Sequence, residues 1–175
     1  MNLNSVIIAA AVAAALGAGT AAAQAQNSKA TQAEKSFMTE AIQGDLAEVE
    51  MGKLAQQKGT SQDVKQLGST LVTDHGANLD KAKSVAQSAG VTPPSAPSAK
   101  QKAMYDRMSK LSGEQFDKQF AKEMVQDHQK DIRGFEKQSK SSGPVGEFAK
   151  DTLPTLRKHL EMAQSLSRST TGSSR

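Results

Sequence analysis

The chain has 175 residues and no cysteine, which excludes disulfides, thiolate metal sites, cysteine nucleophiles and lipid attachment at a cysteine. Its net charge of +4 comes from 22 basic and 18 acidic residues that are mixed along the chain, as on a solvated surface, so we expect no nucleic-acid partner. Only 3% of the residues are aromatic, and helix formers such as Ala, Leu, Gln, Lys and Glu predominate, which predicts an all-α fold with one domain.

The first segment, residues 1–25, has the pattern of a signal peptide. An apolar run from Val6 to Leu16 is followed by small residues that end in Ala23-Gln24-Ala25, an A-x-A cleavage pattern. No Lys or Arg precedes the run, so the amino terminus supplies the only positive charge there. The run is about half as long as the roughly 20 residues that span a bilayer. We therefore predict cleavage near Ala25, export, and a mature chain without a membrane-spanning segment.

The first helix is expected over residues 37–58, after a polar segment, 26–36, that is predicted to be a disordered linker. Gly59 marks the end of this helix. Gly44 and Gly52 fall in its apolar stripe, where a glycine costs roughly 1 kcal/mol relative to alanine. Close helix packing would explain both glycines.

A second helix is expected from its N-cap Ser61 to residue 89, with Gly90 as its stop. The next residues, 91–99, contain three prolines and are expected to be an extended linker. Residues 100–111 then form a short amphipathic helix. This long connection separates the first pair of helices from the second.

The third helix is expected to begin at Ser112, with Gln115 at the capping-box position, and to end near residue 141. A fourth helix is expected over residues 145–167, and Pro154 in its interior predicts a kink or a restart. Residues 168–175 are rich in Ser, Thr and Gly and are expected to be a flexible tail. Short outer loops and one long connection predict an antiparallel four-helix bundle over residues 37–167.

Each of the three histidines of the chain lies at the centre of an apolar helical stripe. The same stripes define the positions that are expected to face the core: Phe37, Ala41, Leu67, Leu71, Phe120, Met124, Ile132, Leu156 and Ala163. A fourth polar residue, Glu48, lies in the corresponding stripe of the first helix.

The four polar residues are predicted to lie at one level of the bundle. His75, His128 and His159 are each 14 residues from a helix end near a loop, or roughly 21 Å at ~1.5 Å per residue. Glu48 is 11 residues from Gly59, or roughly 16 Å. The difference is less than one helical turn.

Burying four polar groups together costs several kcal/mol unless something pairs them. Neutral imidazole and carboxylate suit a transition metal, so we predict a zinc, iron or copper ion bound by Glu48, His75, His128 and His159. Asp131, one turn after His128, could add an oxygen ligand. The alternative is a set of core histidines that are satisfied by hydrogen bonds alone.

Two further acidic residues, Asp74 and Asp127, each precede a histidine by one residue, about 100° around the helix. They are therefore expected to be surface residues or caps to neighbouring side chains. Met51, Met124 and Met162 lie one turn from the predicted ligands and leave copper open, although methionine is also a common filler in bundles.

Several separate motifs resemble one family. They are the run Ala47 to Ala55, the two Asp-His pairs, Leu111-Ser112-Gly113 before Phe116-Asp117, and Leu153-Pro154-Thr155-Leu156 before His159-Leu160-Glu161-Met162-Ala163. Over about residues 34–167 the chain resembles the domain of unknown function 4142. The resemblance implies a ferritin-like bundle in an exported, periplasmic bacterial protein. Members are often labelled outer membrane proteins, and the family has no established function.

The chain departs from the di-iron pattern of better-known ferritin-like proteins, which place Glu-x-x-His on two helices. Val72 and Leu156 stand three residues before His75 and His159, so one metal ion fits better than two. Enzyme motifs such as Gly-x-Ser-x-Gly, a phosphate-binding glycine loop or His-Glu-x-x-His are absent from the sequence, and we do not expect an enzyme. The competing hypothesis is a helical module that binds a protein or an envelope polymer and uses its His/Glu core only for stability.

Overall fold

The computed structural model describes residues 30–172, and these residues form five helices and no strand. The helices are α1 (Gln32–Lys58), α2 (Gln62–Ser88), α3 (Ala99–Ser109), α4 (Gly113–Gln138) and α5 (Pro144–Gly172). The all-α prediction, with four long helices and a short extra helix in the long connection, is confirmed. None of the helices in residues 30–172 is long and apolar enough to cross a membrane. The predicted signal peptide lies outside the described residues.

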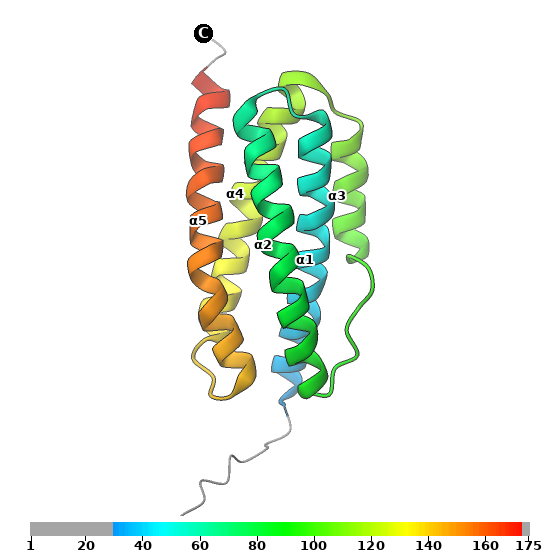
Figure 1. The fold of residues 1–175 in the computed structure, drawn as a ribbon, viewed down its shortest axis with the longest axis vertical. Helices are drawn as coiled ribbons and strands as arrows, with labels where there is room; N and C mark the ends of the chain where they lie inside the picture. The colour runs from blue at the N-terminus through cyan, green and yellow to red at the C-terminus, as the bar shows by residue number, and fades with distance from the viewer. Residues whose placement is uncertain (1–29, 173–175) are drawn as a thin grey trace, which may run out of the picture.

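The four long helices form a bundle in which spatial neighbours run antiparallel (Figure 1). Helix α1 packs mainly against α2, and α4 packs mainly against α5, while α2 also contacts α5 and α1 also contacts α4. The connection after α2 returns along the outside of the bundle and carries α3, which packs on α1 (Figure 1). This single crossover makes α2 and α4 run in the same direction, as in ferritin-like bundles.

Side-chain caps set the beginnings of three helices. Thr31 and Glu34 form a capping box, so α1 begins at Gln32 and residues 32–36, expected in the linker, are helical. Ser61 caps α2 as predicted, because its hydroxyl accepts a hydrogen bond from the Val64 N–H. A second capping box starts α3: Ser98 with Gln101.

The predicted capping box at Ser112 is not formed, because the Ser112 side chain makes no cap hydrogen bond. Gly113 has a φ of +61°, so regular helix geometry begins one residue too late for the serine to reach the free N–H groups. Helix α5 runs without a restart through Pro154, which faces solvent where water can hydrate the freed carbonyl group. It also continues to Gly172, so residues 168–172 of the expected tail are helical.

Two glycines allow a close approach of α1 and α2. A Cβ atom on Gly52 would lie 2.6 Å from the Gly68 carbonyl oxygen, and one on Gly68 would lie 2.7 Å from the Gly52 oxygen. The close packing expected at Gly52 is therefore present. At Gly44 the expectation is wrong, since a Cβ there would meet nothing nearer than an Asp131 oxygen at 4.0 Å.

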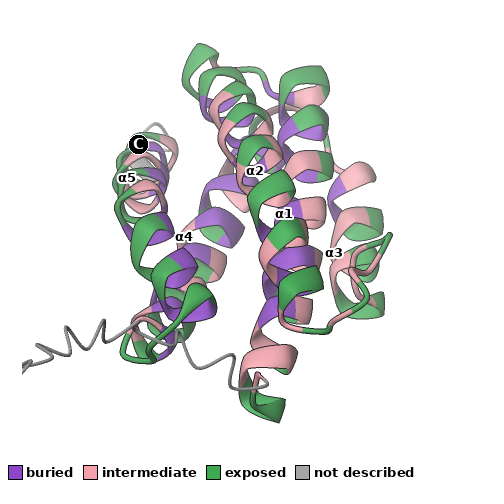
Figure 2. Ribbon diagram, turned by 60° about the horizontal axis from the view of Figure 1, so that its bottom comes forward, coloured by how far each residue is buried: buried purple, intermediate pink, exposed green. Residues whose placement is uncertain are grey.

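The apolar core consists of two clusters that are separated along the bundle axis. One contains Leu71 of α2 and Met124 of α4, and the other contains Ala82 of α2 and Ile132 of α4. The buried positions face the interior of the bundle on the long helices (Figure 2), and most of them are apolar. Eight of the nine predicted core residues are buried; the ninth, Phe37, is half-buried and packs edge-on against Phe135. In α2, α4 and α5 a histidine lies between the two clusters.

Candidate metal centre

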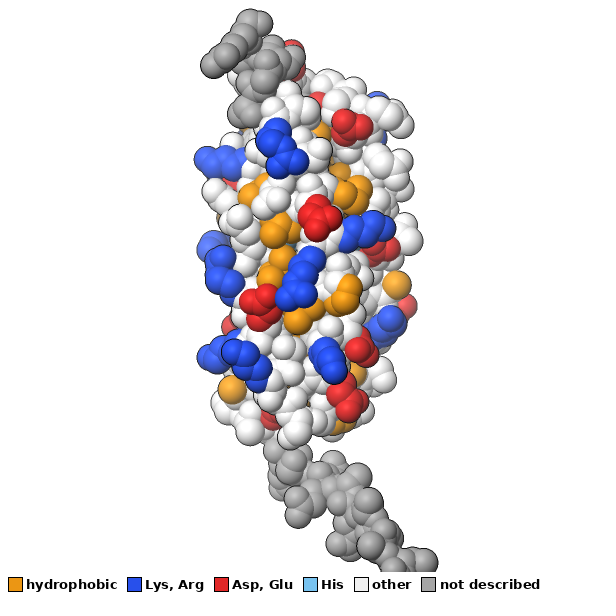
Figure 3. Space-filling view, turned by 90° about the vertical axis from the view of Figure 1, so that its left-hand side faces the viewer, with side chains coloured by type: hydrophobic (Ala, Val, Ile, Leu, Met, Phe, Trp, Pro, Cys, Tyr) orange, Lys and Arg blue, Asp and Glu red, His pale blue; other side chains and the backbone are white. Residues whose placement is uncertain are grey.

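The three histidines meet in the middle of the bundle, between the two apolar clusters. His75 of α2, His128 of α4 and His159 of α5 are 4%, 1% and 0% exposed. One nitrogen from each ring lies within 4.8 Å of the corresponding nitrogens of the other two. On the face drawn in Figure 3, no histidine reaches the surface. The predicted convergence of the three imidazoles is present.

The outward nitrogen of each ring is held by an acceptor. His75 Nδ1 lies 2.8 Å from an Asp45 oxygen, and His159 Nε2 lies 2.8 Å from an Asp74 oxygen. His128 Nδ1 lies 2.9 Å from the Met124 carbonyl oxygen, one turn earlier in α4. A carbonyl or carboxylate oxygen only accepts, so each of these ring nitrogens carries the hydrogen in the neutral imidazole.

The inward nitrogens of the neutral rings are consequently His75 Nε2, His128 Nε2 and His159 Nδ1, and each presents a lone pair. His128 Nε2 lies 3.3 Å from His159 Nδ1. His75 Nε2 is buried and has no hydrogen-bond partner among the described residues. His128 Nε2 and His159 Nδ1, joined by His75 Nε2 when that ring is neutral, therefore converge where no donor among the described residues reaches them, and a cation would satisfy all three.

Burial and mutual repulsion keep two of the rings neutral. Burial, reinforced by the neighbouring His75 and His159, lowers the pKa of His128 to about 3. The pKa of His159 is also lowered, by burial and by His75, against the opposing effect of Asp74. Burial alone would lower the pKa of His75, but its hydrogen bond with Asp45 and the nearby Glu48 charge raise it above the usual value.

Glu48 of α1 is the buried carboxylate predicted on the fourth helix. It is 5% exposed, and its Oε2 atom has no hydrogen-bond partner among the described residues. Burial raises its pKa to about 8, against the favourable charge of His75. Asp131 of α4 lines the same cavity as Glu48, and burial raises its pKa to about 6. Both carboxylates lie outside the group of ligand atoms within 4.8 Å, which consists of the three histidines.

Asp45 takes a position that the sequence did not indicate, and Asp74 caps a side chain of another helix. Asp45 is one turn before Glu48 and accepts hydrogen bonds from His75 and from the Asn78 amide. Asp74, expected at the surface or as a cap, reaches from α2 to His159 of α5. The expectation that Asp74 caps a neighbouring side chain is met, but the sequence did not show that this side chain is His159.

The polar network extends from the centre toward one side of the bundle. Thr152 of α5 donates its hydroxyl hydrogen to the Phe148 carbonyl oxygen or to Asn78 Oδ1, and Asn78 donates to Asp45. Asp45 is thereby oriented toward His75. An imidazole whose outer N–H is held by an oriented carboxylate is the arrangement that fixes ring orientation and increases basicity at metal sites.

The ligand set suits a tetrahedral transition-metal ion. Two nitrogens bound to such an ion at about 2.0 Å lie roughly 3.3 Å from each other. The His128 and His159 nitrogens already have a spacing of 3.3 Å, and the third imidazole lies within reach of the same point. Neutral imidazoles favour zinc, copper or iron.

Comparisons with known proteins give the family and the fold. The sequence model of a family described as Domain of unknown function (DUF4142) matches residues 19–166. Among solved structures, the fold is similar to a DUF305 fragment from Deinococcus radiodurans, with a TM-score of 0.70 and 18% sequence identity, over 81% of this chain and 99% of that chain. At this identity the similarity shows the fold alone. No curated protein matches the chain.

Proposed function

The chain belongs to the family described as Domain of unknown function (DUF4142), and we propose that it is an exported, periplasmic protein that binds one transition metal ion, zinc, iron or copper, in the bundle core. His75, His128 and His159 supply three ligands, and Glu48 supplies the fourth. Export is supported by the apolar run and the A-x-A pattern of residues 1–25.

The observation that carries the metal proposal is the convergence of three buried imidazole nitrogens, each of which presents a lone pair when its ring is neutral. Each ring is oriented by an acceptor on its outer side, so rotation of a ring would break a hydrogen bond of 2.8–2.9 Å. A structural role alone would be served better by apolar side chains, because unpaired buried polar groups cost roughly 1–3 kcal/mol each. A bound cation removes this cost.

Glu48 supports the proposal independently. Its Oε2 atom is buried without a partner, and the charges of Glu48 and His75 affect each other's pKa. A carboxylate turned toward the three imidazoles would complete a four-coordinate site and offset part of the positive charge of the ion. Binding of the ion would then offset the free-energy cost of burying the Glu48 carboxylate.

The experiment is a metal analysis of the untagged protein, since a histidine tag would bind metal itself. We expect about one equivalent of zinc, iron or copper after purification, or about one equivalent of Zn²⁺ bound on titration of chelator-treated protein. His128→Ala should abolish this binding. Gln138→Ala is the matched control, because Gln138 is also buried on α4 but is bonded to Ser141, away from the centre.

Wild-type protein that retains no metal and binds no Zn²⁺, Fe²⁺ or Cu²⁺ would refute the metal proposal. The helical module that binds a protein or an envelope polymer would then replace it. Export has its own test, the intact mass of protein from a periplasmic extract. A chain that begins near Gln26 is expected, and a chain that begins at Met1 would contradict it.

A further inference from the structure

Cavities on two sides of the bundle are lined by the buried residue His75. His75 lines one cavity between α1 and α4, and it also lines another between α2 and α5. The two cavities differ in charge and in the availability of ligands. These differences identify the side by which an ion would enter.

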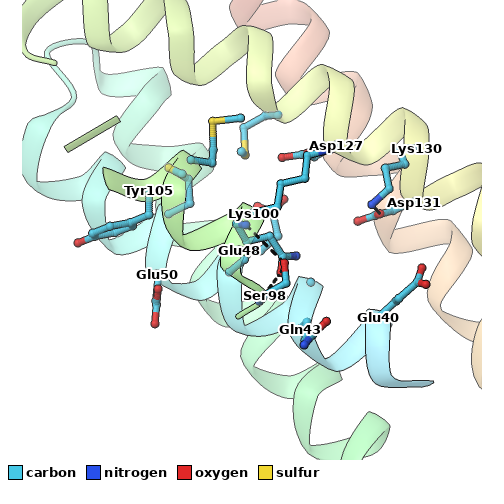
Figure 4. A pocket seen from close by; sticks show the side chains of 16 residues that line it. Glu40, Gln43, Glu48, Glu50, Ser98, Lys100, Tyr105, Asp127, Lys130 and Asp131 are labelled. Carbon is cyan, nitrogen blue, oxygen red and sulfur yellow. Dashed lines mark hydrogen bonds and ion pairs between the residues drawn. The ribbon is translucent and has the colours of Figure 1, made fainter. Parts of the chain in front are cut away.

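Two adjoining cavities lie on the α1–α4 side, an outer one and an inner one. The outer cavity has a volume of about 270 Å³, lies between α1, α3 and α4, and reaches Glu48 (Figure 4). The inner cavity has a volume of about 210 Å³ and reaches Asp45 and His75. Gly44 and Asp131 are among the five residues that line both cavities, so the two cavities adjoin there.

The walls of the outer cavity attract cations. Five carboxyl groups and two lysines line it: Glu40, Glu48, Glu50, Asp127 and Asp131, with Lys100 and Lys130. With its pKa of about 8, Glu48 is mostly protonated at neutral pH, which leaves four charged carboxylates against two lysines. Lys130 is largely exposed and contacts Asp131 only at 4.0 Å, so its charge is well solvated and weakly paired. An acidic cleft with low-dielectric walls raises the local concentration of cations and their rate of entry.

Carboxylate side chains that can bind an ion lie close to one another on this side. Figure 4 shows Asp131 and Asp127 on α4 opposite Glu48 on α1. Only 5% of Glu48 is exposed, and its Oε2 atom has no hydrogen-bond partner among the described residues. Gly44 adds no side chain to the passage, and even a Cβ there would stay 4.0 Å from Asp131 Oδ2.

The α2–α5 cavity is larger, about 690 Å³, but it has fewer acidic groups that could bind an ion. Three carboxylates and two lysines line it, Asp74, Glu147 and Asp151 with Lys81 and Lys158, so its charge is nearly balanced. Its innermost polar groups, Asp74 and Asn78, already bond to His159 and Asp45. These groups are therefore partly engaged already and are poorer ligands for an entering ion than an unpartnered carboxylate.

We propose that metal ions enter and leave the three-histidine site from the α1–α4 side, with Glu48 and Asp131 as ligands on the way, through the passage that Gly44 keeps open. This inference rests on the proposed metal-binding function. In this inference Asp131 binds the ion during entry and release and is not a ligand in the final site. It also explains why residue 44 is a glycine, which close helix packing does not explain.

The test measures rates of Co²⁺ binding and release by stopped-flow absorbance on the full mature chain. Gly44→Leu should obstruct the passage and slow both rates by about tenfold, leaving the equilibrium affinity nearly unchanged. Asp131→Asn should slow association by about threefold through the lost charge. Gly44→Ala, which meets no atom closer than 4.0 Å, should fold normally and slow the rates less than leucine does.

The matched control obstructs the other side. Ala77 is exposed and lines the α2–α5 cavity, so Ala77→Leu should leave both rates unchanged. Slower rates in Ala77→Leu with normal rates in the Gly44 and Asp131 variants would overturn the proposed route in favour of α2–α5. Equal rates in all variants would overturn it as well. Wild-type protein that binds no Co²⁺, Zn²⁺, Fe²⁺ or Cu²⁺ would instead refute the metal-binding function itself.

Discussion

His128 Nε2 lies 3.3 Å from His159 Nδ1, although neither nitrogen carries a hydrogen in the neutral tautomers that their outer partners impose. The Met124 carbonyl fixes the hydrogen of His128 on Nδ1, and Asp74 fixes that of His159 on Nε2. Two lone pairs therefore face each other in the centre of the bundle. This relationship makes the metal-free protein sensitive to pH and to substitution at the site.

Acidification should destabilise the metal-free protein through His128. Its pKa is about 3 in the folded state, against 6.5 for a free histidine. Between these values the unfolded state binds a proton that the folded state does not, so stability falls as pH falls from 6.5 toward 3, by up to about 1.4 kcal/mol per pH unit.

The measurement is urea unfolding of chelator-treated protein at several pH values. His128→Leu should show a flatter loss of stability over this range than the wild type, because leucine takes up no proton. Parallel curves for the two proteins would show that His128 titrates normally in the fold.

Glu48→Gln should change the stability of the metal-free protein and its metal affinity in opposite directions. The pKa of Glu48 rises from 4.5 to about 8 on folding, so the folded state holds a proton that the unfolded state releases between these values. Stability therefore falls as pH rises from 4.5 to 8. Glutamine removes this loss, and the variant should be more stable than the wild type at pH 8.

At the same pH the variant should bind Zn²⁺ at least about tenfold more weakly, because a carboxylate ligand is lost. Urea unfolding without metal and a Zn²⁺ competition titration provide the two readouts. A less stable metal-free variant at pH 8 would mean that Glu48 is ionised and paired in the fold.

Gly52→Ala should destabilise the contact between α1 and α2. The new Cβ would lie 2.6 Å from the Gly68 carbonyl oxygen, and backbone atoms cannot move aside without shifting a helix. Overpacking of this kind costs about 1–3 kcal/mol. The measurement is the urea midpoint.

Gly76→Ala is the control, since a Cβ on this helical glycine meets nothing within 4 Å. It should stabilise the protein by about 0.5–1 kcal/mol through helix propensity. Equal effects of the two substitutions would contradict the close approach of α1 and α2.

Asp117→Ala should loosen the loop between α1 and α2. The Asp117 carboxylate on α4 accepts hydrogen bonds from the Thr60 N–H, the Thr60 hydroxyl and the Ser61 N–H. Loss of a buried carboxylate with several donors costs about 1–3 kcal/mol, because those donors are left unpaired. Thermal unfolding measures the effect, and Asp151→Ala, at an exposed position on α5, should stay within about 0.5 kcal/mol of wild type. Similar melting temperatures for both variants would count against the anchoring role of Asp117.

The sequence by itself determined the helices, their buried faces and the common level of the three histidines. Helix faces follow from a spacing of 3.6 residues per turn, which depends on local backbone geometry alone. The common level of the histidines along the bundle was predictable from helix length. Helix α2 has 27 residues and is about 40 Å long, so a residue 14 positions from either end lies at its middle. His75 and His128 therefore meet even though they were counted from loops at opposite ends of the bundle (Figure 1).

Only the tertiary structure decided which acceptor orients each imidazole. Asp74 and His75 are adjacent in the sequence, yet Asp74 turns to His159 while His75 turns to Asp45. This choice depends on how α2 is rotated against α1 and α5, and close contacts such as that of Gly52 with Gly68 set the rotation. Such contacts join residues far apart in the chain, so local periodicity carries no information about them. The cavity at Gly44 has the same origin, because open space between α1 and α4 depends on the packing of whole helices.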